Sequence, residues 1–371
     1  MKISRDRFLE TFLELVSIDG APRNEKNVNA YIRHVLNDYV TSIEEDTAGD
    51  ILQGNSGNLL ITLKGTDPSL PPIILSAHMD TVSSTCGIVP TVAGDRITSG
   101  GATILGADDR LGIAIICEVV RSLKENQERY GDVEIVFSIC EEIGLCGAKE
   151  FDYSRLTGKA VFVLDSGDTD VGTVICKSPT GIRYDAEIHG KAAHAGIAPE
   201  TGVNAIEIAA KAIARIEQGR LSPTMTANIG KIEGGSAFNV VPDIVRLNGE
   251  VRSYIDNDAH KYIQNVKSIF HEEAVKKGGS ASIVVYDNFT AFDVSPESLV
   301  IELCRKAFKG KIILESAFGG SDANVFNQKG FPAVVLGIGA RKLHSCDEYV
   351  VIDEIVSAAE WIYNIVLAAG K

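Results

Sequence analysis

Long hydrophobic runs are missing from this sequence, which excludes the simplest membrane architecture. No apolar stretch reaches the roughly 20 residues that a helix needs to cross a bilayer. The start of the chain instead spaces Phe8, Phe12, Leu13 and Val16 as on one face of a helix. We interpret this segment as an amphipathic helix of the folded protein and not as a signal peptide.

Clusters of basic residues are also missing. The 36 Lys and Arg residues are outnumbered by 50 Asp and Glu residues, which gives a formal net charge of -14. Such a charge repels phosphate backbones and anionic lipid surfaces, and no Lys/Arg cluster provides a local exception. We therefore expect neither a nucleic acid nor a membrane as a partner.

The seven cysteines form no recognisable framework. Their number is odd, and no CxxC pair suggests a disulfide or a thiolate zinc site. A reducing, cytoplasmic location fits this pattern. Cys140 lies beside two glutamates and could be considered a nucleophile, but its apolar neighbours at a strand end favour plain core packing.

The chain is long enough for two domains. At 371 residues it exceeds the size that one hydrophobic core usually supports. Short apolar runs predict buried strands of a mainly parallel sheet, and an apolar helix with Ile115, Val119 and Leu123 on one face lies between two of them. The predicted strands are 73–76, 133–139, 160–164 and 333–337. We expect an α/β domain with helices on both faces of the sheet.

A region with a different residue pattern interrupts the predicted α/β domain. From about residue 179 to 292 the sequence alternates polar and apolar residues, as in RYDAEIHG and VRLNGEVRSY, and predicts helices over 202–218 and 259–276. Lys277-Gly278-Gly279-Ser280 reads as a helix stop and a turn. We predict a discontinuous catalytic domain, residues 1–178 and 293–371, interrupted by an inserted α+β domain, residues 179–292.

Candidate functional residues follow the predicted strands. His78 and Asp80 follow the first strand on the same side, because side chains alternate along a strand. The carboxyl edge of an α/β sheet is where ligands bind, and a carboxylate such as Asp80 often orients a metal-binding histidine. Asp108 and Asp109 lead into the apolar helix; one acid could serve as a helix cap, whereas Asp108 could bridge two cations.

More acids follow the next two strands. Glu141 and Glu142 are neighbours, so that one can hold a metal while the other stays free as a proton acceptor. Asp165 ends the third strand, and His344 lies in a loop after the last one. The alternative for each acid is a solvated loop. Together they form a set of imidazoles and carboxylates without thiolates, which suits zinc, cobalt or manganese in an open hydrolytic site.

Other motifs carry less weight. Gly337 and Gly339 are not followed by the third glycine of a dinucleotide-binding loop, so a nucleotide enzyme is not favoured. Four further histidines lie on predicted polar helical faces or on an inserted-domain strand, and we interpret them as structural: His34, His189, His260 and His271.

The order of the motifs SAHMDTV, LGADDRLG, CEEIGLCGA, VLDSGD and LHSCDEYV resembles the di-zinc metallopeptidases that include peptidase T, glutamate carboxypeptidase and aminoacylase. The similarity is greatest to the peptidase T branch and runs nearly end to end. The resemblance implies two Zn²⁺ ions per chain, with Co²⁺ or Mn²⁺ as possible substitutes. The implied ligands are His78 and Asp165 for one ion, Glu142 and His344 for the other, and Asp108 between them.

The same resemblance assigns catalytic roles. Glu141 would act as the general base on a water molecule held between the ions, with Asp80 also in the catalytic set. The peptide bond after the bridging aspartate is typically cis in this family, which implies a cis Asp108–Asp109 bond. GKAAHAGIAPETGVNA resembles the lid and dimerisation segment, whose histidine, here His194, reaches the active site of the other subunit of a homodimer; a buried lid histidine is the alternative.

Substrate-binding positions are also implied by the resemblance. Asn239 and Arg252 match lid positions that contact the substrate, and an arginine there could hold a terminal carboxylate with two hydrogen bonds, although a structural ion pair is the alternative. Gly319 and Gly320 belong to a loop that resembles the substrate-lining GGTD loop. Tripeptidases of this type commonly carry arginine where Phe318 stands, which puts strict tripeptide specificity in doubt.

The expected activity is therefore metal-dependent hydrolysis of peptide bonds in short peptides, such as tripeptides. Within the same enzyme class, an aminoacylase-type amidase acting on N-acyl amino acids is the alternative. A catalytically silent peptide-binding scaffold is a more remote one, because every implied ligand and the base are present in the sequence.

Overall fold

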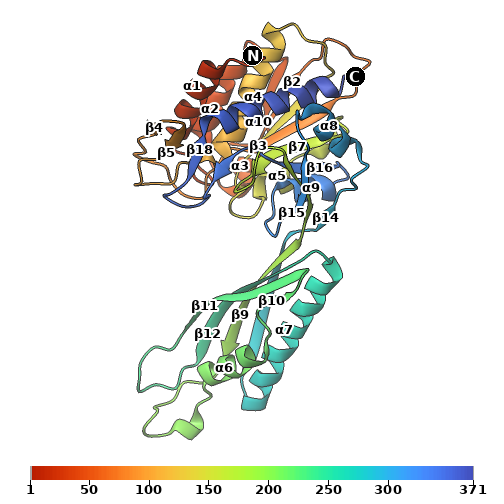
Figure 1. Cartoon of the computed structure of the whole chain (residues 1–371). Helices are drawn as coiled ribbons and strands as arrows, with labels where there is room; N and C mark the ends of the chain where they lie inside the picture. The colour runs from red at the N-terminus through yellow and green to blue at the C-terminus, as the bar shows by residue number, and fades with distance from the viewer. Residues whose placement is uncertain (1, 371) are drawn as a thin grey trace. The chain divides into compact units, whose positions relative to one another are not determined.

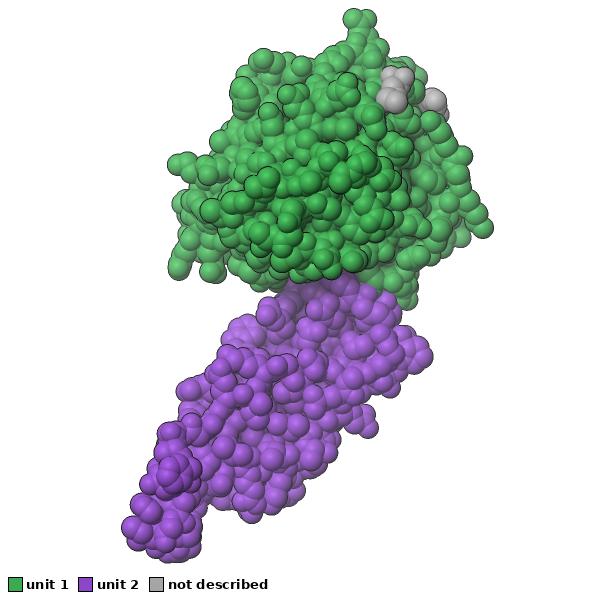
Figure 2. Space-filling model, turned by 60° about the vertical axis from the view of Figure 1, so that its left-hand side comes forward, with its two compact units in different colours: residues 1–177, 293–317, 321–371 green, residues 178–292, 318–320 purple. Residues whose placement is uncertain are grey.

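The computed structural model describes residues 2–370, and the chain divides into two compact units (Figure 2). The larger unit comprises the chain up to Lys177, Asp293–Ala317 and the chain from Ser321, and the smaller one comprises Ser178–Phe292 and Phe318–Gly320. The sequence assigned the whole of 293–371 to the larger domain. Phe318 groups with the smaller unit because Arg252 Nη1 donates a hydrogen bond to its carbonyl oxygen at 2.9 Å and Tyr254 packs on its ring.

A nine-stranded sheet forms the centre of the larger unit (Figure 1). Its main path runs β1-β2-β6-β3-β7-β16-β8-β14, and β15 pairs with β8. The strands β6, β3, β7 and β16 are mutually parallel neighbours, whereas β2 and β8 join this group in antiparallel fashion. Its strands are β1 (Ser42–Glu45), β2 (Leu59–Leu63), β3 (Ile73–His78), β6 (Val133–Ser138), β7 (Val161–Ser166), β8 (Thr173–Ser178), β14 (Phe292–Asp293), β15 (Ile313–Ser316) and β16 (Ala333–Gly337). The predicted mixed α/β fold with a mainly parallel sheet is confirmed.

The helix α4 (Ala107–Glu125) packs directly on β3 and β7, and α1, α2 and α10 pack on α4. Because the sheet and other helices surround α4, almost every side chain of this helix is buried. The other helices of this unit are α1 (Arg5–Val16), α2 (Lys26–Leu36), α3 (Ala48–Leu52), α5 (Cys146–Glu150), η1 (Tyr153–Arg155), α8 (Leu299–Ala307), α9 (Asp322–Gln328) and α10 (Ile352–Ala368). Among residues 2–370, no helix is long and apolar enough to cross a membrane.

The predicted amphipathic helix at the start of the chain is α1, which buries Phe8, Phe12 and Val16 as expected. Leu13, expected on the same face, is only half-buried, and Leu15 is buried in its place. A small antiparallel sheet in the order β17-β18-β5-β4 completes the larger unit. Its strands are β4 (Thr91–Ala93), β5 (Arg96–Thr98), β17 (Ala340–Arg341) and β18 (Tyr349–Val351).

Glu118 is a buried carboxylate that ties α1 to α4. Its oxygens accept hydrogen bonds from Ser4 N at 2.7 Å, from Arg7 Nε at 2.8 Å and from Ser122 Oγ at 2.7 Å. Because Glu118→Ala would leave the Arg7 guanidinium without its buried partner, we expect it to lower the free energy of unfolding by about 3–5 kcal/mol. Urea titration followed by circular dichroism measures this change.

Glu125 provides the matched control, since it lies on the same helix and also pairs with Arg7, at 2.5 Å. Its side chain is 45% exposed, so Glu125→Ala should cost only about 0–1 kcal/mol. Equal losses in the two variants would contradict the role of the buried carboxylate.

The smaller unit is a five-stranded antiparallel sheet in the order β10-β11-β12-β9-β13, with α6 and α7 packed on it. Its core includes Tyr184, Ile208, Val266 and Phe270. Its elements are β9 (Thr180–His189), η2 (Pro199–Thr201), α6 (Ala205–Arg215), β10 (Gly219–Ser222), β11 (Met225–Gly234), β12 (Ile244–Ser253), α7 (Asp256–Lys277) and β13 (Ser280–Phe289). The predicted helix stop is present, since Gly278 adopts φ 77 directly after α7.

Candidate active site

The carboxyl ends of three neighbouring parallel strands carry the predicted site residues of the larger unit. His78 is the last residue of β3 and pairs in register with Ser138, the last residue of β6. Glu141 and Glu142 follow β6, and Asp165 is the last residue but one of β7. Since parallel strands end at the same edge of a sheet, these side chains collect at one place.

Asp108 lies between two histidines from distant parts of the chain. His78 Nε2 is 2.9 Å from Asp108 Oδ1, and His344 Nε2 is 3.2 Å from Asp108 Oδ2. Each histidine therefore faces a different oxygen of the same carboxylate. The peptide bond between Asp108 and Asp109 is cis, as predicted.

Asp165 and Glu142 lie on either side of this arrangement. Asp165 Oδ1 is 3.6 Å from His78 Nε2, and Glu142 Oε1 is 3.3 Å from His344 Nε2. The structure thus brings all five predicted metal ligands together. Donor atoms of His78, Asp108 and Glu142 all lie within 4.8 Å of one another, and so do those of His78, Asp109 and Asp165. Either trio is close enough for metal coordination.

Asp80 organises the glutamate pair. Its two carboxylate oxygens accept hydrogen bonds from the backbone nitrogens of Glu141, at 3.0 Å, and Glu142, at 3.1 Å. His78 Nδ1 lies 3.0 Å from the backbone oxygen of Asp80 and 3.5 Å from its Oδ1. The backbone carbonyl is therefore the closer partner of the histidine, while the carboxylate fixes the turn that carries Glu141 and Glu142.

The site concentrates negative charge in a buried region. Burial raises the pKa of Glu141 well above its usual value, and burial together with the charge of Asp108 raises the pKa of Asp165 to about 7. Hydrogen bonds with Asp108 and Glu142 raise the pKa of His344 to about 10. Buried charges of one sign require compensation, and cations held by these oxygens would supply it.

Two further buried groups support the site, and the sequence had not singled them out. Arg110 lies two residues after Asp108 and donates a hydrogen bond to the carbonyl of Met79, between His78 and Asp80. Asp322, at the start of α9, accepts a hydrogen bond from Ser138 Oγ, and burial raises its pKa to about 6. The signal for Asp322 was its place in the loop that resembles the GGTD motif.

Both oxygens of Asp109 are engaged by backbone nitrogens. One of its oxygens accepts a hydrogen bond from the backbone nitrogen of His78 at 3.2 Å, and the other from that of Gly112 at 3.1 Å. It therefore fixes the start of α4 against the end of β3. Cys140 is buried and its thiol lies 3.4 Å from Glu25 Oε1, a packing role consistent with the sequence interpretation.

The remaining predicted site residues lie in the smaller unit. His194 is exposed, and its neighbour Ala195 donates a backbone hydrogen bond at 3.0 Å to Asn239, which is also exposed. These two predicted residues thus lie on adjoining segments. Arg252 pairs with Glu250 at 3.1 Å, in addition to its bond to Phe318.

Gly319 is exposed, and Gly320 is half-buried. The backbone nitrogen of Ser321 after them already donates to Asn324 Oδ1 at 3.0 Å. The side chains of Ser321 and Asn324 therefore cap the start of α9, the helix that follows the two glycines.

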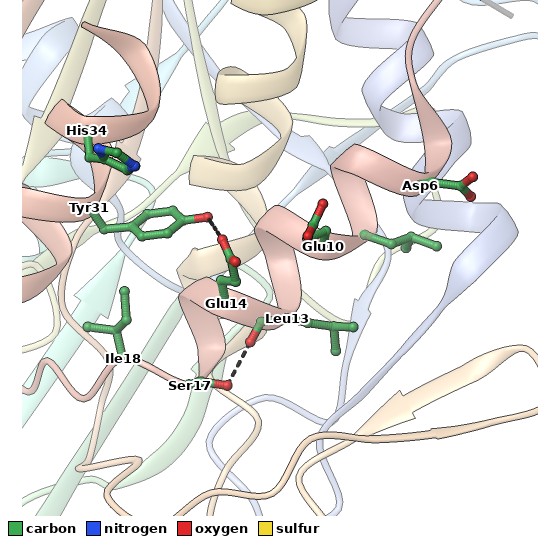
Figure 3. A pocket seen from close by; sticks show the side chains of 9 residues that line it. Asp6, Glu10, Leu13, Glu14, Ser17, Ile18, Tyr31 and His34 are labelled. Carbon is green, nitrogen blue, oxygen red and sulfur yellow. Dashed lines mark hydrogen bonds between the residues drawn. The ribbon is translucent and has the colours of Figure 1, made fainter.

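A separate groove of about 890 Å³ lies between α1 and α2, and Figure 3 shows its lining. Leu13 and Tyr31 contribute apolar surface, Asp6 and Glu10 contribute charge, and the Tyr31 hydroxyl is hydrogen-bonded to Glu14. None of the predicted catalytic, metal or substrate residues lines this groove.

Comparison with known proteins identifies the family. The model of the peptidase dimerisation domain matches residues 180–278, and the model of peptidase family M28 matches residues 58–200. The chain is similar to the crystal structure of aminopeptidase PepT from Bacillus cereus, with a TM-score of 0.93 and 36% identity over 100% of both chains. The chain belongs to the peptidase T-like metallopeptidases.

Other similar proteins also match nearly the whole chain. A tripeptidase from Staphylococcus aureus has a TM-score of 0.95 and 34% identity over 100% of both chains. Uncharacterized protein YqjE from Bacillus subtilis is 38% identical, again over 100% of both chains. Peptidase T from Clostridium perfringens is 27% identical over 96% of this chain and 97% of its own. The predicted family, the inserted dimerisation domain and the assignment as a metallopeptidase are confirmed.

Proposed function

We propose that this peptidase T-like enzyme cleaves short peptides, including tripeptides, with two zinc ions held at the carboxyl edge of the larger sheet. The observation that carries the proposal is the position of Asp108, whose two carboxylate oxygens face His78 and His344 separately. A carboxylate that offers one oxygen to each side is the group expected to bridge two cations.

The donor groups fit such a centre. His78 and Asp165 would hold one ion and His344 and Glu142 the other, with Asp108 shared. Glu142 Oε1 is buried and lies 3.3 Å from His344 Nε2, so both atoms could hold the same cation. Imidazole and carboxylate donors without thiolates suit zinc and also cobalt or manganese.

The ions, when bound, would lower the pKa of a water molecule and polarise the carbonyl of the substrate. Glu141 lies beside the ligands without being one of them, and we assign it as the general base. In this role Glu141 would take a proton from the water molecule and pass it to the leaving amine. Asp80 keeps the Glu141–Glu142 turn in place through its two backbone hydrogen bonds.

We assign substrate binding to residues of the smaller unit. We propose that Asn239, Arg252 and the backbone at Gly319 and Gly320 contact the peptide. The names Peptidase T and tripeptidase, borne by relatives, support free peptides as substrates over the N-acyl amino acids of an amidase. The match to the dimerisation model supports a homodimer, in which the partner subunit's His194 would complete the site.

The cellular setting follows from the cysteines. All seven are free thiols in the structure, including the exposed Cys86 and Cys346. A reducing compartment keeps such thiols reduced, and we propose the cytoplasm as the location.

Metal content together with tripeptide cleavage tests the proposed function. We expect two zinc ions per chain, and we expect chelation to abolish cleavage and added zinc to restore it, because the ions activate the water. N-acetyl amino acids, tested beside free tripeptides and dipeptides, serve as the comparison. Cleavage of the acetylated compounds alone would contradict the assignment as a peptidase and favour an amidase. Two bound ions without cleavage of any compound would indicate a catalytically silent scaffold.

A further inference from the structure

Glu348 is a buried carboxylate that lies between two ligand-bearing segments without being a ligand. It is 1% exposed and immediately precedes β18, four residues after His344. Its backbone nitrogen donates to the carbonyl of Ser345 at 3.1 Å, which closes the turn that follows His344. The backbone of Glu348 is thus part of the structure that carries this histidine.

The side chain of Glu348 reaches the other segment. Its Oε2 accepts a hydrogen bond from Gly106 N at 2.8 Å, and its Oε1 accepts one from Asp108 N at 3.2 Å. Gly106 has φ 74, a backbone conformation that glycine adopts readily, and it turns the chain into α4. Both oxygens of Glu348 are therefore engaged by the backbone around the bridging aspartate.

We propose that Glu348 is a positioning residue of the metal centre, which holds Asp108 and the turn of His344 at the separation that a shared ion requires. This inference rests on the proposed two-metal function. Glu348 joins segments 242 residues apart in sequence, so its hydrogen bonds fix the backbone of Asp108 relative to the turn of His344.

The chemistry explains why glutamate stands here. A carboxylate offers acceptors on both oxygens, so it can receive two backbone N–H groups at once, and charge strengthens both bonds. The amide of glutamine has one acceptor oxygen, and its NH₂ group would face one of the two N–H donors. Glu348→Gln keeps the size of the side chain but loses one of the two hydrogen bonds.

Metal titration of Glu348→Gln tests the proposal, with Asp347→Asn as the matched control. Asp347 is the neighbouring acid of the same turn, but its side chain is 78% exposed and pairs with Lys342 at 3.6 Å. We expect Zn²⁺ affinity, measured by competition with a chromophoric chelator, to fall about 10–100-fold for at least one of the two ions in Glu348→Gln. The control should bind as the wild type does.

Unchanged affinity for both ions in Glu348→Gln, or an equal loss in Asp347→Asn, would overturn the proposal. Circular dichroism and the thermal midpoint establish that both variants are folded. A second measurement needs no variant: hydrogen exchange of the wild-type protein after chelation. The amides of Gly106 and Asp108 should remain protected without metal, and exchange as fast as in an open loop would refute the positioning role.

Failure of the proposed function is distinguishable from failure of this inference. Wild-type protein that binds two ions but cleaves no peptide would refute the function and leave the positioning role intact. Wild-type protein that binds a single ion would refute both.

Discussion

Glu141→Gln should abolish peptide cleavage while leaving the metal content unchanged. The substitution keeps the shape of the side chain but removes the proton acceptor, and general-base catalysis typically contributes about 10²–10⁴-fold to the rate. Metal should stay because the predicted ligands are other residues, and the turn is held by backbone bonds to Asp80. The measurement is kcat for a tripeptide beside the number of zinc ions per chain.

Glu150→Gln is the control for this substitution. Glu150 is the exposed last residue of α5, close in sequence to Glu141 but outside the predicted site. It should retain both metal and turnover. Near wild-type turnover by Glu141→Gln would remove the assignment of this residue as the base.

Asp108→Ala should act differently, because it removes metal as well as activity. Asp108 is the one predicted ligand that lies within hydrogen-bond distance of both histidines, so its loss affects both ion positions. We expect the affinity for both ions to fall by about 100-fold or more, above the effect of losing a partner that only orients a ligand. Metal content after dialysis and kcat/KM in added zinc measure the two consequences.

Asp95→Ala is a suitable control, since Asp95 is exposed between β4 and β5. If Asp108→Ala kept two tightly bound ions, Asp108 would not be the bridge. The contrast between the variants separates the two roles. Glu141→Gln should bind metal but not cleave the peptide, whereas Asp108→Ala should lose both metal binding and cleavage.

These expectations depend on features that the sequence alone could indicate. Alternation along a strand places His78 and Asp80 on the same side. Apolar runs of strand length predict β3, β6, β7 and β16. Parallel strands end at one edge, so acids that follow them are expected to converge. The helix after Asp109 was also predictable, because its apolar residues recur at helical spacing.

Several features of the site could not be read from local patterns. The antiparallel attachment of β2 and β8 to the sheet leaves no mark on strand periodicity. The role of Asp80 in holding the Glu141–Glu142 turn, rather than only His78, depends on backbone nitrogens that every residue type carries. The bond of Arg252 to Phe318 likewise involves a backbone carbonyl, which is why Phe318–Gly320 groups with the smaller unit.

The sequence by itself determined the fold class, the family and the residues that gather at the sheet edge, because hydrophobic periodicity and the order of the motifs can be read directly from the residues. Only the tertiary structure decided which oxygen faces which histidine and that Glu348 reaches Gly106 and Asp108. Those contacts join segments far apart in sequence, and their geometry follows from how the strands and loops pack. A buried carboxylate that accepts hydrogen bonds from backbone N–H groups can pair with almost any residue type. The identity of the donor residues therefore does not reveal such a contact in the sequence.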